Sequence, residues 1–225
     1  MKPALVIVDM QRYYLEEKAD FYRYYQNMMP GSMDYIRNRA DKTVIPNIKL
    51  LLDTFRKKEL TVVFLRLCGL HPEREDLHVF FKEAWEAGKK AGYPELYPLA
   101  DDPFSEVIRE LSPEREEREF IKQTFSAFTS SAFEDWLLQE GIDTLVMSGL
   151  ATSQCVETTA RDASDRSYQV IQVEDAQADY DQKTHDASLH SSRGVCGGMV
   201  VGTQQVADFF VNWSSLPKPD SREHR

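Results

Sequence analysis

The sequence predicts an α/β fold of three layers, in which a mostly parallel six-stranded sheet carries helices on both faces. Two features of the chain indicate this fold. Its short apolar runs are continuous, which is typical of strands buried on both faces. Segments with apolar residues at helical spacing separate these runs, as the crossovers of a parallel sheet require. Of the 225 residues, we expect 1–212 to form a single domain and 213–225 to form a polar C-terminal tail.

The N-terminal part of the chain supplies two predicted strands and the helix between them. The run Ala4–Val8 is apolar throughout and predicts the first strand. A helix is predicted from Thr43, as its N-cap, to about Lys58, with Pro46 in the first turn, where its missing N–H does little harm. Its apolar residues have helical spacing and are Ile48, Leu51, Leu52 and Phe55. The run Thr61–Leu67 predicts the second strand.

The middle of the chain continues the alternation. A weaker apolar run at Glu119–Ile121 predicts the third strand. The next helix ends at Gly141, a residue typical of the position after a helix C-terminus. One face of that helix is marked by Phe133, Trp136 and Leu137. The fourth strand is predicted at Asp143–Met147.

The C-terminal part supplies two more strands and three helices. A helix after Cys155 is marked by its apolar face, Val156, Ala160 and Ala163. Tyr168–Val173 predicts the fifth strand, a helix follows at about Thr184–Ser192, and Met199–Val201 predicts the sixth strand. Thr203 is the expected N-cap of a final helix that buries Val206, Phe209 and Phe210.

Two long segments interrupt the alternation of strands and helices. Residues from about Leu15 to Arg39 are rich in tyrosine, and residues from about Leu70 to Pro113 are charged and contain several prolines. Connections of this length in a compact domain are typical of lids, binding loops or oligomer contacts.

Composition and charge exclude several classes of partner. The formal net charge is −10 and the basic residues do not cluster, which argues against nucleic acid or an anionic membrane as a partner. No apolar run reaches the roughly 18 residues of a membrane span. The run after Met1 stops at Asp9, which is too short for a signal peptide, so we expect a cytoplasmic protein. The cysteines are odd in number and far apart, and free thiols are expected at Cys68, Cys155 and Cys196.

Three residues suited to chemistry fall at the carboxyl ends of predicted strands, where parallel sheets bind ligands. Asp9 follows the first strand, and a partly desolvated carboxylate there suits proton transfer. Lys122 follows the third, where an ammonium facing a pocket would stabilise neighbouring anions. Cys155 lies at a helix start after the fourth, where unpaired N–H groups and the helix dipole favour a thiolate.

Each of the three also has an ordinary explanation. Cys155 has the alternative of a buried, inert thiol, and Lys122 that of a solvated surface residue. Asp9 has the alternative of capping a loop. Asp9 could also be the phosphoryl acceptor of a haloacid-dehalogenase-like phosphatase, although that pattern places a second aspartate where this chain has Gln11.

Three segments of the chain carry a family resemblance. They are Ala4-Leu5-Val6-Ile7-Val8-Asp9-Met10-Gln11, Lys122 with Phe125-Ser126-Ala127-Phe128, and Gly149-Leu150-Ala151-Thr152-Ser153-Gln154-Cys155-Val156. In this order and spacing, and with further matches at Thr159–Ala163 and Val173–Ala176, they resemble the cysteine hydrolases of the isochorismatase-like superfamily. That group includes nicotinamidases, N-carbamoylsarcosine amidase, and ureidoacrylate and biuret amidohydrolases. The resemblance runs from about Pro3 to Phe210 and implies the isochorismatase-like hydrolase fold.

The resemblance implies a role for each site residue. Asp9 would be the proton-transfer group, Lys122 its electrostatic partner and Cys155 the nucleophile, with the backbone N–H groups of Ala151 and Cys155 as the oxyanion hole. It also implies a cis peptide bond between Leu150 and Ala151, a small-molecule substrate, and homo-oligomers such as dimers or tetramers. Because the helix start and Lys122 act in the same direction, we expect the pKa of the Cys155 thiol to lie below its ordinary value.

The resemblance also separates branches of the superfamily. Isochorismatases that cleave a vinyl ether lack the nucleophilic cysteine, so Cys155 favours hydrolysis of an amide or related C–N bond. Nicotinamidases carry an aspartate and histidines after the second strand for a metal, and the corresponding stretch Leu65–His71 lacks that spacing. Because His71 and His78 alone are more typical of loop residues than of ligands, we expect no metal and no other cofactor.

The predicted function is therefore hydrolysis of a C–N bond in a small amide, urea-like or carbamoyl compound through a covalent thioester. The alternative is a catalytically silent ligand-binding or scaffolding protein of the same fold. Gln11 and Tyr14 are the candidates for the substrate pocket. The tyrosines near Tyr14 are compatible with an aromatic or planar pocket and equally with an oligomer interface. Arg66, Arg161 and Arg193 are each candidates for binding a substrate carboxylate, and the sequence does not distinguish among them.

Overall fold

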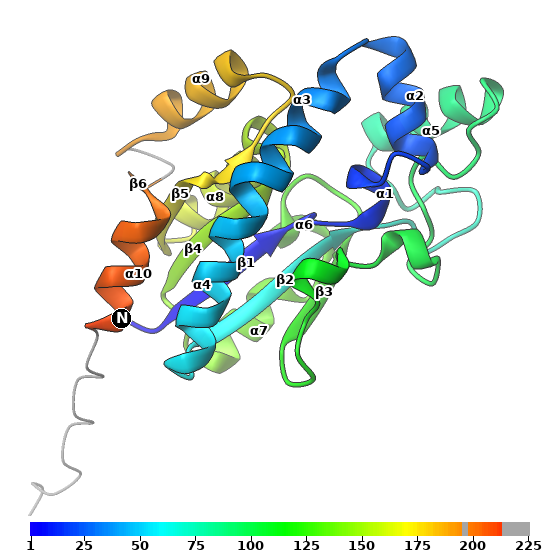
Figure 1. Cartoon of the computed structure of the whole chain (residues 1–225). Coiled ribbons are helices and arrows are strands. Elements are labelled where there is room, and N and C mark those ends of the chain that lie inside the picture. The colour runs from blue at the N-terminus through cyan, green and yellow to red at the C-terminus, as the bar shows by residue number, and fades with distance from the viewer. Residues whose placement is uncertain (195–197, 213–225) are drawn as a thin grey trace, which may run out of the picture.

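The computed structural model describes residues 1–194 and 198–212 of the chain. Its centre is a six-stranded sheet in the order β3-β2-β1-β4-β5-β6, with every neighbouring pair parallel (Figure 1). The strands are β1 (Pro3–Val8), β2 (Thr61–Leu67), β3 (Arg118–Lys122), β4 (Thr144–Leu150), β5 (Gln169–Ala178) and β6 (Met199–Val201). The predicted fold class is thereby confirmed.

Helices cover both faces of the sheet, as continuous apolar strands require. On one face, Leu5 and Ile7 of β1 pack in a core with the apolar sides of α4 (Ile45–Lys57) and α10 (Thr203–Val211). On the other face, Ala4, Val6 and Val8 belong to a second core with α6 (Ala127–Ser130), α7 (Phe133–Glu140) and α8 (Glu157–Asp165). The helix α9 (Gln182–Ser192) packs against α8 and β5.

The two long segments predicted to interrupt the alternation are partly helical. The first contains α2 (Asp20–Met28) and α3 (Ser32–Arg39) and is preceded by α1 (Arg12–Leu15), and the second contains α5 (Val79–Lys90). The second segment also has two short 3₁₀ turns, at Pro103–Ser105 and Arg109–Leu111. Figure 1 shows α1, α2 and α5 grouped beyond the carboxyl ends of β1 and β2, which is the edge where a parallel sheet binds ligands.

Strand positions were predicted better than strand lengths. β2 and β6 have the predicted bounds, whereas β4 continues three residues further, to Leu150, and β5 continues to Ala178. The extensions are built from small and polar residues such as Ser148 and Gln177, which are nonetheless fully buried. An apolar run therefore marks the centre of these strands and misses their carboxyl ends.

The predicted N-cap at Thr43 is wrong, because the chain is already helical from Ser32. A π-helical turn at Ala40–Val44 joins α3 to α4, and the N–H of Ile45 donates to the carbonyl of Ala40. This turn lies beside Pro46, which has no N–H to donate and would break a regular α-helix at this point. The π-helical turn lets one long helical segment continue past the proline.

The last helix also begins differently from the prediction. Gly202 is its N-cap and Thr203 its first residue. Both the N–H and the hydroxyl of Thr203 donate to Oδ1 of Asp175, at 2.7 Å each, so Thr203 anchors α10 to β5. The predicted tail at 213–225 and the predicted free thiol of Cys196 lie outside the described residues, while Cys68 and Cys155 are free thiols. Within 1–194 and 198–212, no helix has the length and apolar character to cross a bilayer.

Candidate active site

The structure brings together the three residues that the sequence singled out. Asp9 directly follows β1, Lys122 is the last residue of β3, and Cys155 lies in a π-helical turn, Thr152–Val156, that follows β4. Nζ of Lys122 lies 2.9 Å from Oδ2 of Asp9 and 3.2 Å from Sγ of Cys155. All three side chains are buried. A carboxylate, an ammonium and a thiol thus meet at the carboxyl edge of the sheet.

Close contact between β1 and β4 sets the distance between Asp9 and the cysteine turn. Gly149 pairs with Val8 and has a φ of 106°, a conformation that residues with a side chain rarely adopt. A Cβ atom at Gly149 would lie 2.1 Å from the carbonyl oxygen of Val8, so only glycine fits there. Asp9 itself has a φ of 50°, and its N–H extends the β1–β2 ladder by donating to Leu65 at 2.9 Å.

The turn that carries Cys155 is held from two sides. The peptide bond between Leu150 and Ala151 is cis, as the family resemblance implied. The carbonyl oxygen of Ala151 accepts the N–H groups of Gln154 and Val156, at 3.1 and 3.3 Å. Directly after β5, the buried carboxylate of Asp179 accepts the N–H of Ser153 at 2.6 Å. Sequence reasoning missed Asp179, because the residues around it resemble an ordinary strand end.

A second buried contact joins this turn to α9. Nδ1 of His185 lies 2.8 Å from the hydroxyl of Thr152, and Nε2 lies 3.2 Å from a guanidinium nitrogen of Arg39. A guanidinium can only donate, so Nε2 accepts and Nδ1–H donates to Thr152. Burial, together with the charge of Arg39, lowers the pKa of His185 and keeps the ring neutral. The sequence offered no signal for this role beyond a histidine inside a predicted helix.

Replacing His185 with leucine is expected to lower the free energy of unfolding by about 1–3 kcal/mol, because it leaves the buried Thr152 hydroxyl without its partner. Urea unfolding at neutral pH measures the change. The matched control is His190→Leu on the same helix, where the exposed side chain should change stability by less than about 0.5 kcal/mol. Equal effects of the two substitutions would contradict the contact.

The electrostatic balance of the site depends on Lys122. Its ammonium makes three contacts, with Asp9, with Cys155 and with the carbonyl oxygen of Thr124 at 3.1 Å, which uses all three of its N–H donors. Burial alone lowers the pKa of Lys122, but the neighbouring Asp9 and Cys155 outweigh it, and the net direction is upward. The ion pair with Asp9 is therefore maintained, and it already neutralises the site.

The structure corrects the expectation of an acidic Cys155. Burial raises the pKa of the Cys155 thiol, the charge of Asp9 adds to this, and Lys122 opposes both without cancelling them. The cause is charge balance: a thiolate beside the Asp9–Lys122 pair would leave an excess negative charge in a buried site. The sequence indicated the helix start and Lys122, but it did not indicate how deeply the sulfur is buried. The raised pKa favours the thiol form of Cys155 over the thiolate.

Alkylation of Cys155 by iodoacetamide is therefore expected to keep accelerating with pH beyond about 10, where an ordinary thiol with a pKa of about 8.5 has reached its plateau. Only the thiolate reacts, and a raised pKa moves the thiolate plateau upward. Lys122→Met should slow labelling further, since Lys122 opposes the shift. Mass spectrometry of the Cys155 peptide reads the rate, with Cys155→Ala as the blank for other thiols. A half-maximal labelling rate at or below about pH 8.5 would contradict the raised pKa.

A cavity of about 240 Å³ opens beside the three residues. Asp9, Ala151, Gln154 and Cys155 form its polar side. Its other walls are apolar or aromatic: Tyr13, Tyr14, Phe21, Tyr25, Met29, Leu67, Phe80, Phe81, Tyr97 and Tyr180. Sequence reasoning named Tyr14 as a pocket residue, and Tyr14 lines the cavity. It missed Phe80, Phe81, Tyr97 and Tyr180, which lie far along the chain in the second long segment and after β5.

The other predicted pocket residue, Gln11, faces a different way. Its amide accepts the N–H of Leu67 at 2.8 Å and donates to the carbonyl of Ser105 at 2.6 Å. It is fully buried and is not among the described residues that line the cavity. The structure thus places Gln11 between β1, β2 and the loop at Ser105, where it supports the sheet edge.

The arginines considered as carboxylate clamps also lie elsewhere. Arg66 donates to Ser105, Ala100 and Glu119, and Arg161 binds Glu157. Arg193 borders a groove next to β6. None of the three is among the described residues that line the cavity.

The histidines of the second long segment were considered for a metal. Nδ1 of His78 accepts the N–H of Phe80 and caps α5, which gives this side chain a structural role. Within the described parts of the chain, no three His, Cys, Asp or Glu side chains gather in a way that could hold a metal ion.

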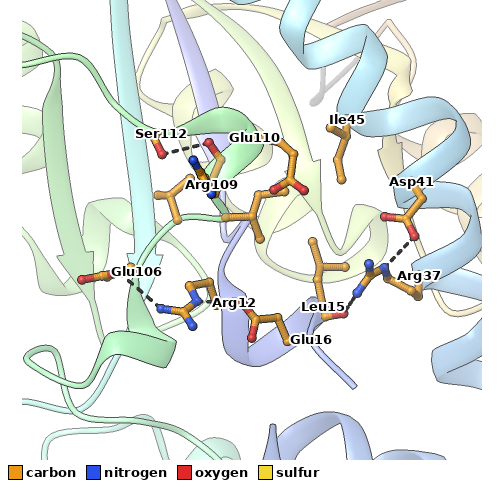
Figure 2. Close-up of a pocket in the computed structure, with 12 residues that line it drawn as sticks. Arg12, Leu15, Glu16, Arg37, Asp41, Ile45, Glu106, Arg109, Glu110 and Ser112 are labelled. Atoms are coloured by element: carbon orange, nitrogen blue, oxygen red, sulfur yellow. Dashed lines mark hydrogen bonds and ion pairs between the residues drawn. The ribbon is translucent and has the colours of Figure 1, made fainter. Parts of the chain in front are cut away.

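A larger cavity of about 450 Å³ lies between α1, the π-helical turn at Ala40–Val44 and the loop around Arg109 (Figure 2). Charged pairs line it. Arg12 contacts Glu16 at 2.7 Å and Glu106 at 3.5 Å, and Arg37 contacts Asp41 at 2.7 Å. Its lining residues include neither Asp9 nor Cys155. We therefore assign the candidate active site to the smaller cavity.

A parallel α/β domain that brings an aspartate, a lysine and a cysteine together at its strand ends has the architecture of the isochorismatase-like hydrolases. The chain belongs to this family, because the Isochorismatase domain model matches residues 3–205. Several known members of the family are amidohydrolases.

Three similar proteins cover most of the chain. Maleamate amidohydrolase from Pseudomonas putida is 24% identical over 88% of this chain and 83% of its own. A cysteine hydrolase from Pseudomonas syringae has a TM-score of 0.77 at 24% identity, over 93% of this chain and 92% of its own. N-carbamoylsarcosine amidase from Thermoplasma acidophilum has a TM-score of 0.64 at 28% identity, over 90% of this chain and 97% of its own.

Proposed function

We propose that the protein is a cysteine-dependent hydrolase that cleaves a C–N bond of a small amide, urea-like or carbamoyl compound through a covalent thioester. The observation that carries the proposal is the position of Lys122, whose ammonium contacts both Asp9 and the Cys155 sulfur beside a cavity large enough for a small molecule. Family membership supports the hydrolase class, and amidohydrolases among the relatives support the bond type.

In the acylation step, Sγ of Cys155 attacks the substrate carbonyl carbon while Asp9 takes the thiol proton. Oδ1 of Asp9 is buried and has no hydrogen-bond partner in the described part of the structure, which leaves it free to accept that proton. Collapse of the tetrahedral intermediate breaks the C–N bond, and the proton passes from Asp9 to the departing amine. The raised pKa of Cys155 suits this order, since the proton leaves only when substrate is present to use it.

In the deacylation step, water attacks the thioester carbonyl and Asp9 takes the water proton. The sulfur then leaves as the acid product forms, and Asp9 passes the water proton to the sulfur, which restores the thiol and the Asp9 carboxylate. Lys122 stays charged throughout and stabilises whichever of Asp9 and Cys155 is negative. No step needs a metal-bound water, because the first nucleophile is sulfur.

The backbone N–H groups of Ala151 and Cys155 form the proposed oxyanion hole. Both residues line the cavity, on the turn that the cis peptide bond begins. A positioned N–H donor of this kind contributes about 2.7–4 kcal/mol to transition-state stabilisation in enzymes where it has been removed. Assembly of the protein into dimers or tetramers stays a prediction of the family resemblance.

Ammonia release from a panel of small amides, ureas and carbamoyl compounds tests the proposal. We expect turnover of at least one compound and, under acid quench, a protein mass that rises by the acyl group on Cys155. The competing function is a catalytically silent binding protein of the same fold. Compounds that bind without ammonia release and without an acylated protein would favour that alternative.

A further inference from the structure

Eight of the fourteen described residues that line the candidate active site are aromatic. The first long segment supplies Phe21 and Tyr25, and the short helix α1 just before it supplies Tyr13 and Tyr14; the second supplies Phe80, Phe81 and Tyr97; and Tyr180 follows β5. These rings contact one another in an unbroken set. Phe21, for example, lies 4.8 Å from Tyr14 and 5.6 Å from Tyr97 between ring centroids. The two segments that interrupt the α/β alternation therefore meet to make one aromatic enclosure.

The enclosure contains no cation to receive a negatively charged substrate. None of the described residues that line it is a lysine, arginine or histidine. The ammonium of Lys122 contacts two residues of the cavity lining, and its three donors are already used by Asp9, Cys155 and Thr124. Asp9, which lines the cavity, would repel a second carboxylate. A carboxylate in this space would be desolvated without a counter-ion, which is strongly unfavourable.

The enclosure does contain neutral hydrogen-bonding groups. The hydroxyls of Tyr14 and Tyr180 lie 2.7 Å apart. Burial raises the pKa of both, so both stay protonated and neutral at physiological pH. One O–H of the pair satisfies the other oxygen, and the second proton is available to an acceptor atom in the cavity. Such a pair binds an uncharged oxygen or nitrogen without supplying a positive charge.

We infer that this site selects amides whose acyl part is uncharged and planar, such as aryl or α,β-unsaturated carboxamides, and rejects amides that carry a carboxylate. The inference rests on the proposed function for the reaction and on the cavity walls for the selectivity. It separates this chain from relatives named for maleamate and N-carbamoylsarcosine, since both of those compounds carry a carboxylate.

Matched ligand pairs test the inference without requiring turnover. In each pair the two members differ only at the charged group: (Z)-but-2-enamide against maleamate, and 4-methylbenzamide against 4-carbamoylbenzoate. Calorimetric titration of the Cys155→Ala variant measures binding, and ammonia release by the unaltered protein measures kcat/KM. We expect the uncharged member to bind, and to react, about 100-fold better or more, since an unpaired buried charge is strongly penalised.

The two measurements keep the inference and the proposed function apart. Preferred binding of the uncharged members supports the inference even where no amide is hydrolysed, an outcome that would remove only the proposed function. Equal or better binding of the carboxylates overturns the inference, as does binding of neither member of any pair.

A variant at the rim of the cavity supplies a second test. Met29 lines the cavity and is 44% exposed, so a longer polar side chain fits there without disturbing the core. Met29→Arg should move the ratio of kcat/KM, or of binding constants, toward the carboxylate member by about 10-fold, because it adds the missing cation. Met29→Leu is the matched control and should leave the ratio unchanged. A ratio that does not respond to Met29→Arg would show that the missing cation does not set the selectivity.

Discussion

Replacing Cys155 with alanine is expected to lower kcat by about four to six orders of magnitude, the range seen when an enzyme loses its nucleophile but keeps its other groups. The physical reason is that neither Asp9 nor Lys122 can replace the sulfur as the atom that bonds to the carbonyl carbon. The fold should survive, because alanine is smaller than cysteine and leaves the Asp9–Lys122 ion pair in place. Ammonia release and circular dichroism measure the two expectations.

Cys68 provides the matched control for that experiment. It is also a buried free thiol, but its sulfur contacts the amide of Gln11 at 3.4 Å and it is not among the described residues lining the cavity. Cys68→Ala should keep most of the activity. Residual turnover by Cys155→Ala above a few per cent would exclude the thioester route and leave a water-based reaction in its place.

Much of the site was predictable because parallel sheets place their strand ends at one edge. Asp9 lies 113 residues before Lys122, and Cys155 lies 33 residues after it, yet each follows or ends an apolar run that could be recognised as a strand. The order of the strands in space was not needed, since any order leaves the carboxyl ends together. The glycine before the cysteine turn was also visible in the sequence, although its contact with Val8 was not.

The walls of the site were not predictable in the same way. The helix α5 contains the adjacent aromatic residues Phe80 and Phe81, and nothing in their spacing shows that they line the same cavity as Tyr14 of α1. Such contacts depend on how two irregular segments pack, which local periodicity does not describe. The pKa of Cys155 was mispredicted for a related reason. Helix position and a nearby lysine are visible in the sequence, whereas depth of burial is a property of the assembled fold.

Lys122→Met is expected to produce the largest loss of stability among single substitutions in the site, about 3–5 kcal/mol. Methionine has nearly the volume of the lysine stem, so packing changes little. The loss comes from Asp9, which is 2% exposed and would keep a carboxylate without its counter-ion. The variant should also lose most activity, because its sulfur has no ammonium to stabilise it. Urea unfolding and ammonia release measure the two effects.

A double-mutant cycle separates the ion pair from other effects of the substitution. Asp9→Asn/Lys122→Met removes both charges, so it should be less destabilised than the sum of the single variants by at least about 1 kcal/mol, while all three remain inactive. Lys57→Met, on the exposed side of α4, is the surface control and should change stability by less than about 0.5 kcal/mol. Additive losses in the cycle would mean that Lys122 supports the site through its buried stem and its contact with Thr124. If the double variant regains stability but not activity, the Lys122 ammonium is needed both to balance the charge of Asp9 and for the reaction.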